Sequence, residues 1–208
     1  MARERVGDAE GRATRGHRLT IHPLTREFWP SLMDLFGKPG ASNGCWCMYW
    51  RVGGAYRDHG NERNRQDFAA VVRRGPPPGL LAFAGDQAVG WCQVTPRVSL
   101  PHLDGLKAFG VGERERIWSV SCFFIRHEHR RRGVGRALLA AAIRFARDGG
   151  ATVLEAYPVE VLSPGTRRDW YTGYVSMFSR AGFRKVGSRR PDQLVMQRKL
   201  RTARSSSA

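Results

Sequence analysis

The sequence predicts one α/β domain in which helices cover both faces of a mixed β-sheet. The chain of 208 residues suits a single domain, and its 41% hydrophobic residues are enough for a core. Stretches with strand spacing and helix spacing alternate along the chain, and no long linker or internal repeat interrupts them. We expect a domain over residues 18–200, preceded by a flexible basic leader at 1–17 and followed by a disordered tail at 201–208.

The first half of the chain carries signals for three strands and two helices. Thr25 can cap a helix that ends at Gly37, and a second helix covers residues 61–74, up to a Gly-Pro-Pro-Pro-Gly run. The tripeptide Gly85-Asp86-Gln87 is a hairpin signal between two apolar runs. The expected strands are 18–22, 80–84 and 88–94.

The second half carries four strand signals and two helix signals. Gly133 opens an amphipathic helix that ends at Gly149-Gly150. Asp169 can cap a further helix that runs to about Arg180 and leads into the last two strands. The expected strands are 116–125, 151–157, 184–188 and 194–200.

Composition narrows the class of protein. The net charge is +17, and all but four of the 35 cationic residues are arginine. A coding bias toward arginine explains this charge, and so does a polyanionic partner such as a phosphorylated cofactor, a nucleic acid or an acidic substrate. No apolar run reaches the roughly 18 residues of a membrane span, and the N-terminus lacks the apolar centre of a secretory signal. With only four cysteines, we expect a cytoplasmic protein with no disulfide framework and no membrane partner.

A basic, glycine-containing turn follows the strand at 116–125. Backbone N–H groups at the start of a helix have no helical acceptor, and together with the helix dipole they bind anions. Glycine lets a phosphate approach the backbone closely. The turn is not the phosphate loop of nucleotide hydrolases, because no Gly-Lys-Ser/Thr follows. It is not Gly-x-Gly-x-x-Gly either, because Leu138 stands at the third glycine position. We expect a diphosphate to bind at Arg130, Arg131, Arg132, Gly133, Val134, Gly135 and Arg136.

Two motifs resemble those of a known family. Arg130-x-x-Gly133-x-Gly135, placed after an apolar strand, resembles the acyl-CoA signature of the GNAT superfamily of N-acyltransferases. The segment Ser176–Phe183 resembles the late helix of that superfamily, which ends in Gly-Phe before a strand. The order of elements from about residue 18 to residue 200 agrees as well.

The resemblance implies a fold and a cofactor site. It implies a mostly antiparallel central sheet of about six to seven strands, opened beside the strand at 116–125. Backbone groups at Cys122, Phe123 and Phe124 would pair with pantetheine, and the basic turn would hold the pyrophosphate of acetyl-CoA. Ser176 and Phe178 on the late helix would belong to the same site.

The resemblance also raises a question about the proton donor. Many superfamily members use a tyrosine four residues before the glycine of Gly-Phe, where this chain has Phe178. Tyr174 and Tyr171 precede Phe178 by four and seven residues, so a continuous helix would place all three on one face. One of these hydroxyls or that of Ser176 can serve instead; alternatively, both tyrosines are core residues and the proton comes from substrate or solvent.

Candidates for the base and for the acceptor site are less sharply defined. Glu115 lies just before the cofactor strand, where some relatives activate the amine through water, although Glu113-Arg114-Glu115-Arg116 is equally a solvated charge pattern. Glu155 and Tyr157, on the strand after the glycine-initiated helix, would face the acceptor amine.

The segment Gly44–Arg51 is the most distinctive local sequence. If the segment is extended, the side chains of Trp46, Met48 and Trp50 lie on one face. That face either lines a pocket for an apolar or cationic acceptor or packs in the core. Its Cys-x-Cys has no second Cys/His pair at ligand spacing, so we expect no metal.

We therefore expect an N-acetyltransferase that moves an acetyl group from acetyl-CoA to a primary amine by direct attack in a ternary complex. A small acceptor such as an amino acid, an antibiotic or a polyamine is favoured. Alternatives are acetylation of a macromolecule (a protein N-terminus, a lysine or an aminoacyl-tRNA) and a non-catalytic module that binds acyl-CoA or nucleic acid. The basic surface allows a tRNA partner, and the protein would be a monomer or a homodimer.

Overall fold

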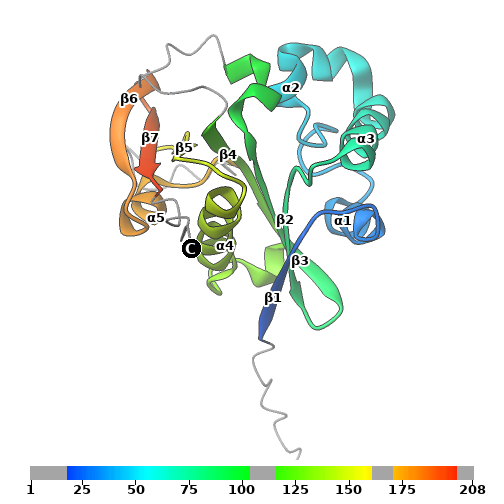
Figure 1. Ribbon diagram of the computed structural model, residues 1–208. Helices are drawn as coiled ribbons and strands as arrows, with labels where there is room; N and C mark the ends of the chain where they lie inside the picture. The colour runs from blue at the N-terminus through cyan, green and yellow to red at the C-terminus, as the bar shows by residue number, and fades with distance from the viewer. Residues whose placement is uncertain (1–17, 104–115, 161–170, 201–208) are drawn as a thin grey trace, which may run out of the picture.

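The fold is built on one seven-stranded sheet (Figure 1). The computed structural model describes residues 18–103, 116–160 and 171–200, so the expected leader and tail lie outside the described residues. The strand order is β1-β2-β3-β4-β5-β7-β6, and of the six pairings between these strands only β4 with β5 is parallel. The expectation of a mixed, mostly antiparallel sheet of six to seven strands is confirmed.

All seven expected strands are present, with ends shifted by a few residues. The hairpin between β2 and β3 turns at Gly85-Asp86, as its sequence predicts. The strands are β1 (Leu19–Pro23), β2 (Gly79–Ala84), β3 (Gln87–Pro96), β4 (Ile117–Ile125), β5 (Val153–Ala156), β6 (Arg184–Arg190) and β7 (Gln193–Lys199).

Helices cover both faces of the sheet. One core contains Leu138 and Leu139 of α4 (Val134–Asp148) together with Phe178 of α5 (Val175–Arg180), packed on inward side chains of β2 to β5 and β7. The opposite core contains Leu32 and Phe36 of α1 (Trp29–Phe36) and Phe68 of α3 (Tyr56–Arg74). A short helix, α2 (Tyr49–Val52), precedes α3. None of the helices in the described ranges combines the length and the apolar character needed to cross a bilayer.

Two expected helix starts are wrong. Thr25 does not cap α1, because that helix begins after Phe28, with no side-chain cap and with Pro30 in its first turn. The late helix begins at Val175, because the chain turns at Gly173 (φ 79°) and flanking backbone groups pair with Val159. Tyr171 and Tyr174 therefore share no helix face with Phe178; Asp169, the expected cap, lies outside the described residues.

The parallel pair β4 and β5 diverges halfway along β4. Pairing runs from Ile117 opposite Val153 to Val120 opposite Ala156, where β5 ends, while β4 continues for five more residues to Ile125. At the point of divergence β4 has a bulge, since Gln93 and Val94 of β3 stand opposite Cys122 and Val120 and leave Ser121 between them. Among the residues that the structure describes, the second half of β4 thus has no neighbouring strand on the β5 side.

Candidate functional site

The turn between β4 and α4 leaves backbone N–H groups without acceptors. The first hydrogen bond of α4 runs from the Ala137 N–H to the Gly133 carbonyl at 3.0 Å, and no side chain caps the helix. Within the described residues the N–H groups of Val134, Gly135 and Arg136 therefore stay unpaired. Gly133 adopts a left-handed conformation (φ 83°), and a Cβ atom at Gly135 would lie 3.2 Å from the Ile125 side chain, so both glycines shape the turn.

The surroundings of this helix start are cationic. Arg130, Arg131, Arg132 and Arg136 are exposed, and the first turn of α4 contains no acidic residue. Arg130 donates from Nε to the Ile125 carbonyl at 3.1 Å, which ties the turn to the end of β4. Glu128 contacts Arg126 rather than these four side chains, with Nε and Oε1 3.9 Å apart. Unpaired amides, the helix dipole and guanidinium groups together give this turn a local charge that favours anions.

The free edge of β4 is partly occupied by the chain itself. The Phe123 N–H donates to the Tyr171 carbonyl, and the Tyr171 ring stacks on Phe124 with the planes 1° apart. The expectation that the Phe123 backbone is free is corrected here: the segment from Tyr171 lies against β4 where β5 has left it. Phe178, expected beside a cofactor, is fully buried between Phe123 and Phe183 and presents no surface to a ligand, whereas Ser176 is exposed.

A pocket of about 360 Å³ opens beside the β4 bulge. Its walls come from five parts of the chain that the fold brings together: the segment that leads into α2, the start of α3, β4, the residues before α5, and the adjoining ends of β6 and β7. The lining residues are Ala41, Ser42, Cys45, Cys47, Tyr49, Trp50, Tyr56, Arg57, Ser121, Cys122, Tyr171, Thr172, Arg189 and Gln193.

The segment Gly44–Arg51 is not extended, contrary to expectation. Trp46 and Cys47 have φ values of 45° and 58°, and α2 starts at Tyr49. Trp46 donates to Asn61 Oδ1 at 2.5 Å and, like Met48, is buried in the core under α1 and α3. Neither residue lines the pocket, but Trp50 does, with its Nε1 bonded to the Ser121 carbonyl at 3.0 Å.

The buried side chain of Asn64 fixes this conformation. Its Nδ2 donates to the carbonyls of Gly44 and Tyr56, at 2.8 and 2.6 Å. These two acceptors flank the segment that carries the cysteines, Tyr49 and Trp50. One amide on α3 therefore positions that wall of the pocket.

Two arginines and three tyrosines give the pocket its polar character. The Arg189 guanidinium lies over the Trp50 ring at 4.9 Å and donates from Nη2 to the Tyr49 hydroxyl at 3.2 Å. Arg57 lies over the Tyr56 ring at 5.0 Å. Neither arginine could be singled out from the sequence, because neither belongs to a motif and the chain contains many other arginines.

The thiols of Cys45 and Cys122 in the pocket are protonated at neutral pH. A hydrogen bond with Cys47, together with burial, raises the pKa of Cys122 well above its ordinary value. Burial, and then the neighbouring Cys47, raises the pKa of Cys45 to about 11. In the described part of the chain, no group of three His, Cys, Asp or Glu residues is placed to hold a metal ion. These thiols form a neutral wall.

Glu155 and Tyr157 lie behind the pocket rather than in its lining. Both are buried, and Glu155 Oε1 accepts from Arg97 Nη1 at 2.8 Å and from the Tyr157 hydroxyl. Burial, with Glu155 as the next cause, raises the pKa of Tyr157 well above its ordinary value. The Tyr157 ring packs on Trp50 at 5.6 Å. Glu155 and Tyr157 thus support the wall of the pocket from behind. The expectation that they face the acceptor is corrected.

Of the three residues expected to be catalytic, one lines the pocket. Tyr171 lines the pocket, while Tyr174 is 45% exposed and does not. Glu115 lies outside the described residues. Tyr49 and Tyr56, which sequence reasoning missed, bring two more hydroxyl-bearing rings to the lining.

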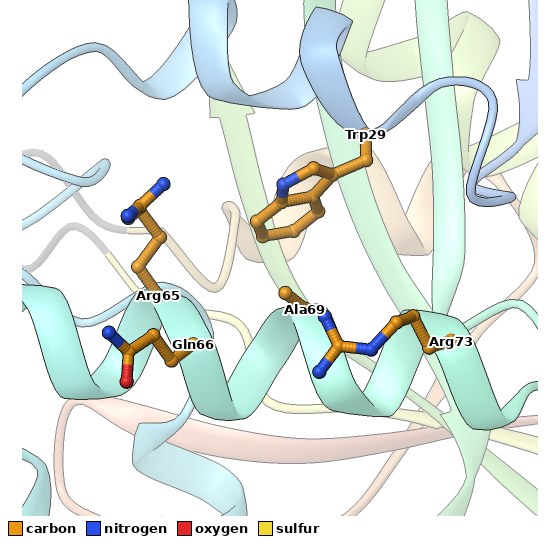
Figure 2. Close-up of a pocket in the computed structure, with 5 residues that line it drawn as sticks. All are labelled: Trp29, Arg65, Gln66, Ala69 and Arg73. Carbon is orange, nitrogen blue, oxygen red and sulfur yellow. The ribbon is translucent and has the colours of Figure 1, made fainter.

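A second hollow, of about 410 Å³, lies between α1 and α3. In Figure 2 the Trp29 indole reaches from α1 toward Ala69, with Arg65 and Arg73 on either side of it. Gln66 completes the lining, and Arg65 pairs with Glu62 at 2.6 Å. The hollow shares no lining residue with the pocket at β4 and contains no base or nucleophile, so the pocket at β4 is the candidate site.

The structure is thus an α/β protein with a cationic, uncapped helix start and a pocket at the two ends of the half of β4 that β5 leaves. Similar folds occur among solved structures. A paia N-acetyltransferase from Thermoplasma acidophilum in complex with coenzyme A is 15% identical, with a TM-score of 0.52, covering 88% of this chain and 99% of its own. The yncA protein from Salmonella typhimurium, solved with its cofactor acetyl-CoA, is 15% identical with a TM-score of 0.54, covering 91% and 98%.

A third similar structure is the ribosomal-protein-S18-alanine N-acetyltransferase from Escherichia coli, which is 12% identical with a TM-score of 0.51 and covers 92% of this chain and 99% of its own. A search of curated protein sequences returns no significant match. The model of the acetyltransferase (GNAT) family matches residues 41–168, which is more than half of the chain. The chain belongs to the GNAT family of acetyltransferases.

Proposed function

We propose that the protein transfers an acetyl group from acetyl-CoA to a primary amine on a small molecule, by direct attack in a ternary complex. The observation that carries this proposal is the adjacency of two features along β4. The unpaired amides of Val134, Gly135 and Arg136 lie just past its C-terminal end, and the pocket opens at its bulge. A donor anchored at the turn and lying along β4 would present its thioester to the pocket.

The turn fits the diphosphate of acetyl-CoA. Its backbone donors are uncapped, four exposed arginines surround them, and no acidic residue stands in the first turn of the helix. When bound, acetyl-CoA supplies an activated acyl thioester. The pantetheine arm would take the edge of β4 beyond Val120, so the Tyr171 carbonyl would have to give up the Phe123 N–H.

The pocket residues would then position the amine and protonate the leaving thiolate. No carboxylate or imidazole lines the pocket in the described part of the chain, so we propose that the acceptor loses its ammonium proton to water before attack. Holding the two reactants together supplies much of the acceleration. As the new C–N bond forms, the thioester C–S bond breaks and the leaving thiolate needs a proton. The Tyr171 hydroxyl is our candidate donor, because its ring lies both in the pocket and against β4. The attacking nitrogen loses its surplus proton to water, and water returns a proton to the tyrosine.

A direct experiment tests this proposal. Free thiol is measured with a chromogenic disulfide after acetyl-CoA and a panel of primary amines are added to the protein. We expect amine-dependent thiol release and a rise in melting temperature with acetyl-CoA. A rise in melting temperature with no thiol release for any amine would favour a non-catalytic acyl-CoA-binding module instead.

A further inference from the structure

The charge of the pocket limits which amines it can accept. We propose that the acceptor amine also carries a carboxylate, as a free amino acid does, and that Arg189 and Arg57 bind this carboxylate. The inference rests on the proposed function, because it concerns the second substrate of the same site. It separates the amino acids from the polyamines and cationic antibiotics that are equally small amines.

The lining of the pocket has two cations that form no ion pair with any residue that the structure describes. Arg57 and Arg189 contribute two guanidinium groups, and no aspartate or glutamate lines the pocket within the described ranges. Neither guanidinium forms an ion pair with a carboxylate of the described residues. A polycation would enter this pocket against like charge, whereas a carboxylate would supply the missing counter-ion.

Arg189 is held in a conformation suited to binding a carboxylate. Its guanidinium lies 4.9 Å above the Trp50 ring, and one of its nitrogens is anchored at 3.2 Å on the Tyr49 hydroxyl. Stacking on an indole uses the face of the guanidinium and leaves in-plane N–H groups for a ligand. Trp50 is itself held by its hydrogen bond to the Ser121 carbonyl. Arg189 therefore loses little side-chain entropy when a carboxylate binds.

The rest of the lining is consistent with this choice. The thiols of Cys45 and Cys122 are protonated, so neither of them attracts a cation. The hydroxyl of Thr172 is buried, has no hydrogen-bond partner among the described residues, and belongs to a residue of the same lining. At about 360 Å³ the pocket is near the lower end of the range for small-molecule sites, about 300–1,000 Å³. This volume suits a single amino acid.

The test compares acceptors that differ only in the carboxylate. Thiol release is measured with free amino acids, with the corresponding amino acid amides, and with spermidine. We expect kcat/KM for the best acid to exceed that of its amide by about tenfold or more, and spermidine to be the poorest acceptor. Arg189→Gln should raise KM for the acid about tenfold, change kcat little and leave the amide unaffected, and Arg189→Lys should recover part of the loss. Arg184→Gln, an exposed cation on β6 outside the pocket, is the matched control and should change neither substrate.

The outcomes are distinguishable. Equal or better turnover of amides or spermidine overturns the inference and leaves the acetyltransferase proposal standing. A preference for the acid that survives in both Arg189→Gln and Arg57→Gln overturns the assignment to these arginines. No thiol release with any amine overturns the proposed function, and the inference falls with it.

Discussion

The backbone N–H of Phe123 donates to the carbonyl of Tyr171, across the side of β4 that β5 has left. The same tyrosine places its ring parallel to Phe124 and lines the pocket at the bulge. One residue therefore contacts the strand on which we propose that the acyl donor lies and the space that we propose for the amine. Its hydroxyl is the group to test first.

We predict that Tyr171→Phe lowers kcat by at least about tenfold while the affinity for acetyl-CoA changes less than twofold, since general acid catalysis contributes about 10²–10⁴. Steady-state kinetics and calorimetry measure the two quantities. Tyr174→Phe is the matched control: Tyr174 is largely exposed outside the pocket, so it should behave as the wild type. Equal kcat in all three proteins would remove Tyr171 from the chemistry.

The arginines of the turn should be needed for donor binding. We predict that the double variant Arg132→Glu and Arg136→Glu weakens acetyl-CoA binding by at least about tenfold, because hydrogen bonds to charged groups contribute about 1.5–3 kcal/mol. Arg144→Glu, exposed further along the same helix, should bind as the wild type does. If Arg144→Glu weakened acetyl-CoA binding equally, the loss of affinity would be due to the lower net charge and not to the arginines of the turn.

The ion pair behind the pocket should contribute to stability. Arg97 and Glu155 are 6% and 1% exposed, so removing one partner leaves a buried charge uncompensated. We predict that Glu155→Gln lowers the free energy of unfolding by about 3–5 kcal/mol in urea denaturation. Asp67→Asn, which removes a partly exposed partner of the exposed Arg63 on α3, should cost no more than about 0.5 kcal/mol. A loss below about 1 kcal/mol for Glu155→Gln would contradict the buried-pair assignment.

The thiol of Cys45 should be slow to alkylate. Its pKa rises from 9.0 to about 11 on folding, so at pH 8 the reactive thiolate fraction is about 100-fold lower than in the unfolded chain. The folded state holds this proton more tightly, so the stabilising contribution is complete below pH 9 and is lost as pH rises through about 11. Mass spectrometry after iodoacetamide treatment, with and without urea, measures the ratio. Equal rates in the two states would refute the shift.

The sequence predicted the fold well because its signals were local. Alternating apolar residues, the Gly85-Asp86 turn and the Gly133 helix start each depend on neighbours along the chain, and each is present in the structure. Local reasoning did not detect that the chain would turn at Gly173. That turn is fixed by backbone bonds to Val159, which the sequence separates from it by more than ten residues.

The site was predictable only in part, for the same reason. The turn before α4 is a continuous segment, so glycine and arginine spacing predicts a helix start there, and the structure has that start with uncapped amides. Anion binding at this turn stays a prediction. The acceptor pocket is assembled from distant segments: Asn64 bends Gly44–Arg51 away from the extended form, and Arg189 reaches Trp50 and Tyr49 from β6. No local pattern distinguishes Arg189 from the other arginines of this strongly basic chain.

The most direct test follows the backbone amides of the turn by NMR as coenzyme A is added to the ¹⁵N-labelled protein. We predict that the signals of Gly133, Val134, Gly135 and Arg136 shift with a saturable dependence on ligand concentration, while those of Gly149 and Gly150 at the far end of α4 stay in place. Unchanged turn amides at concentrations that saturate the protein would contradict a diphosphate held by this helix start.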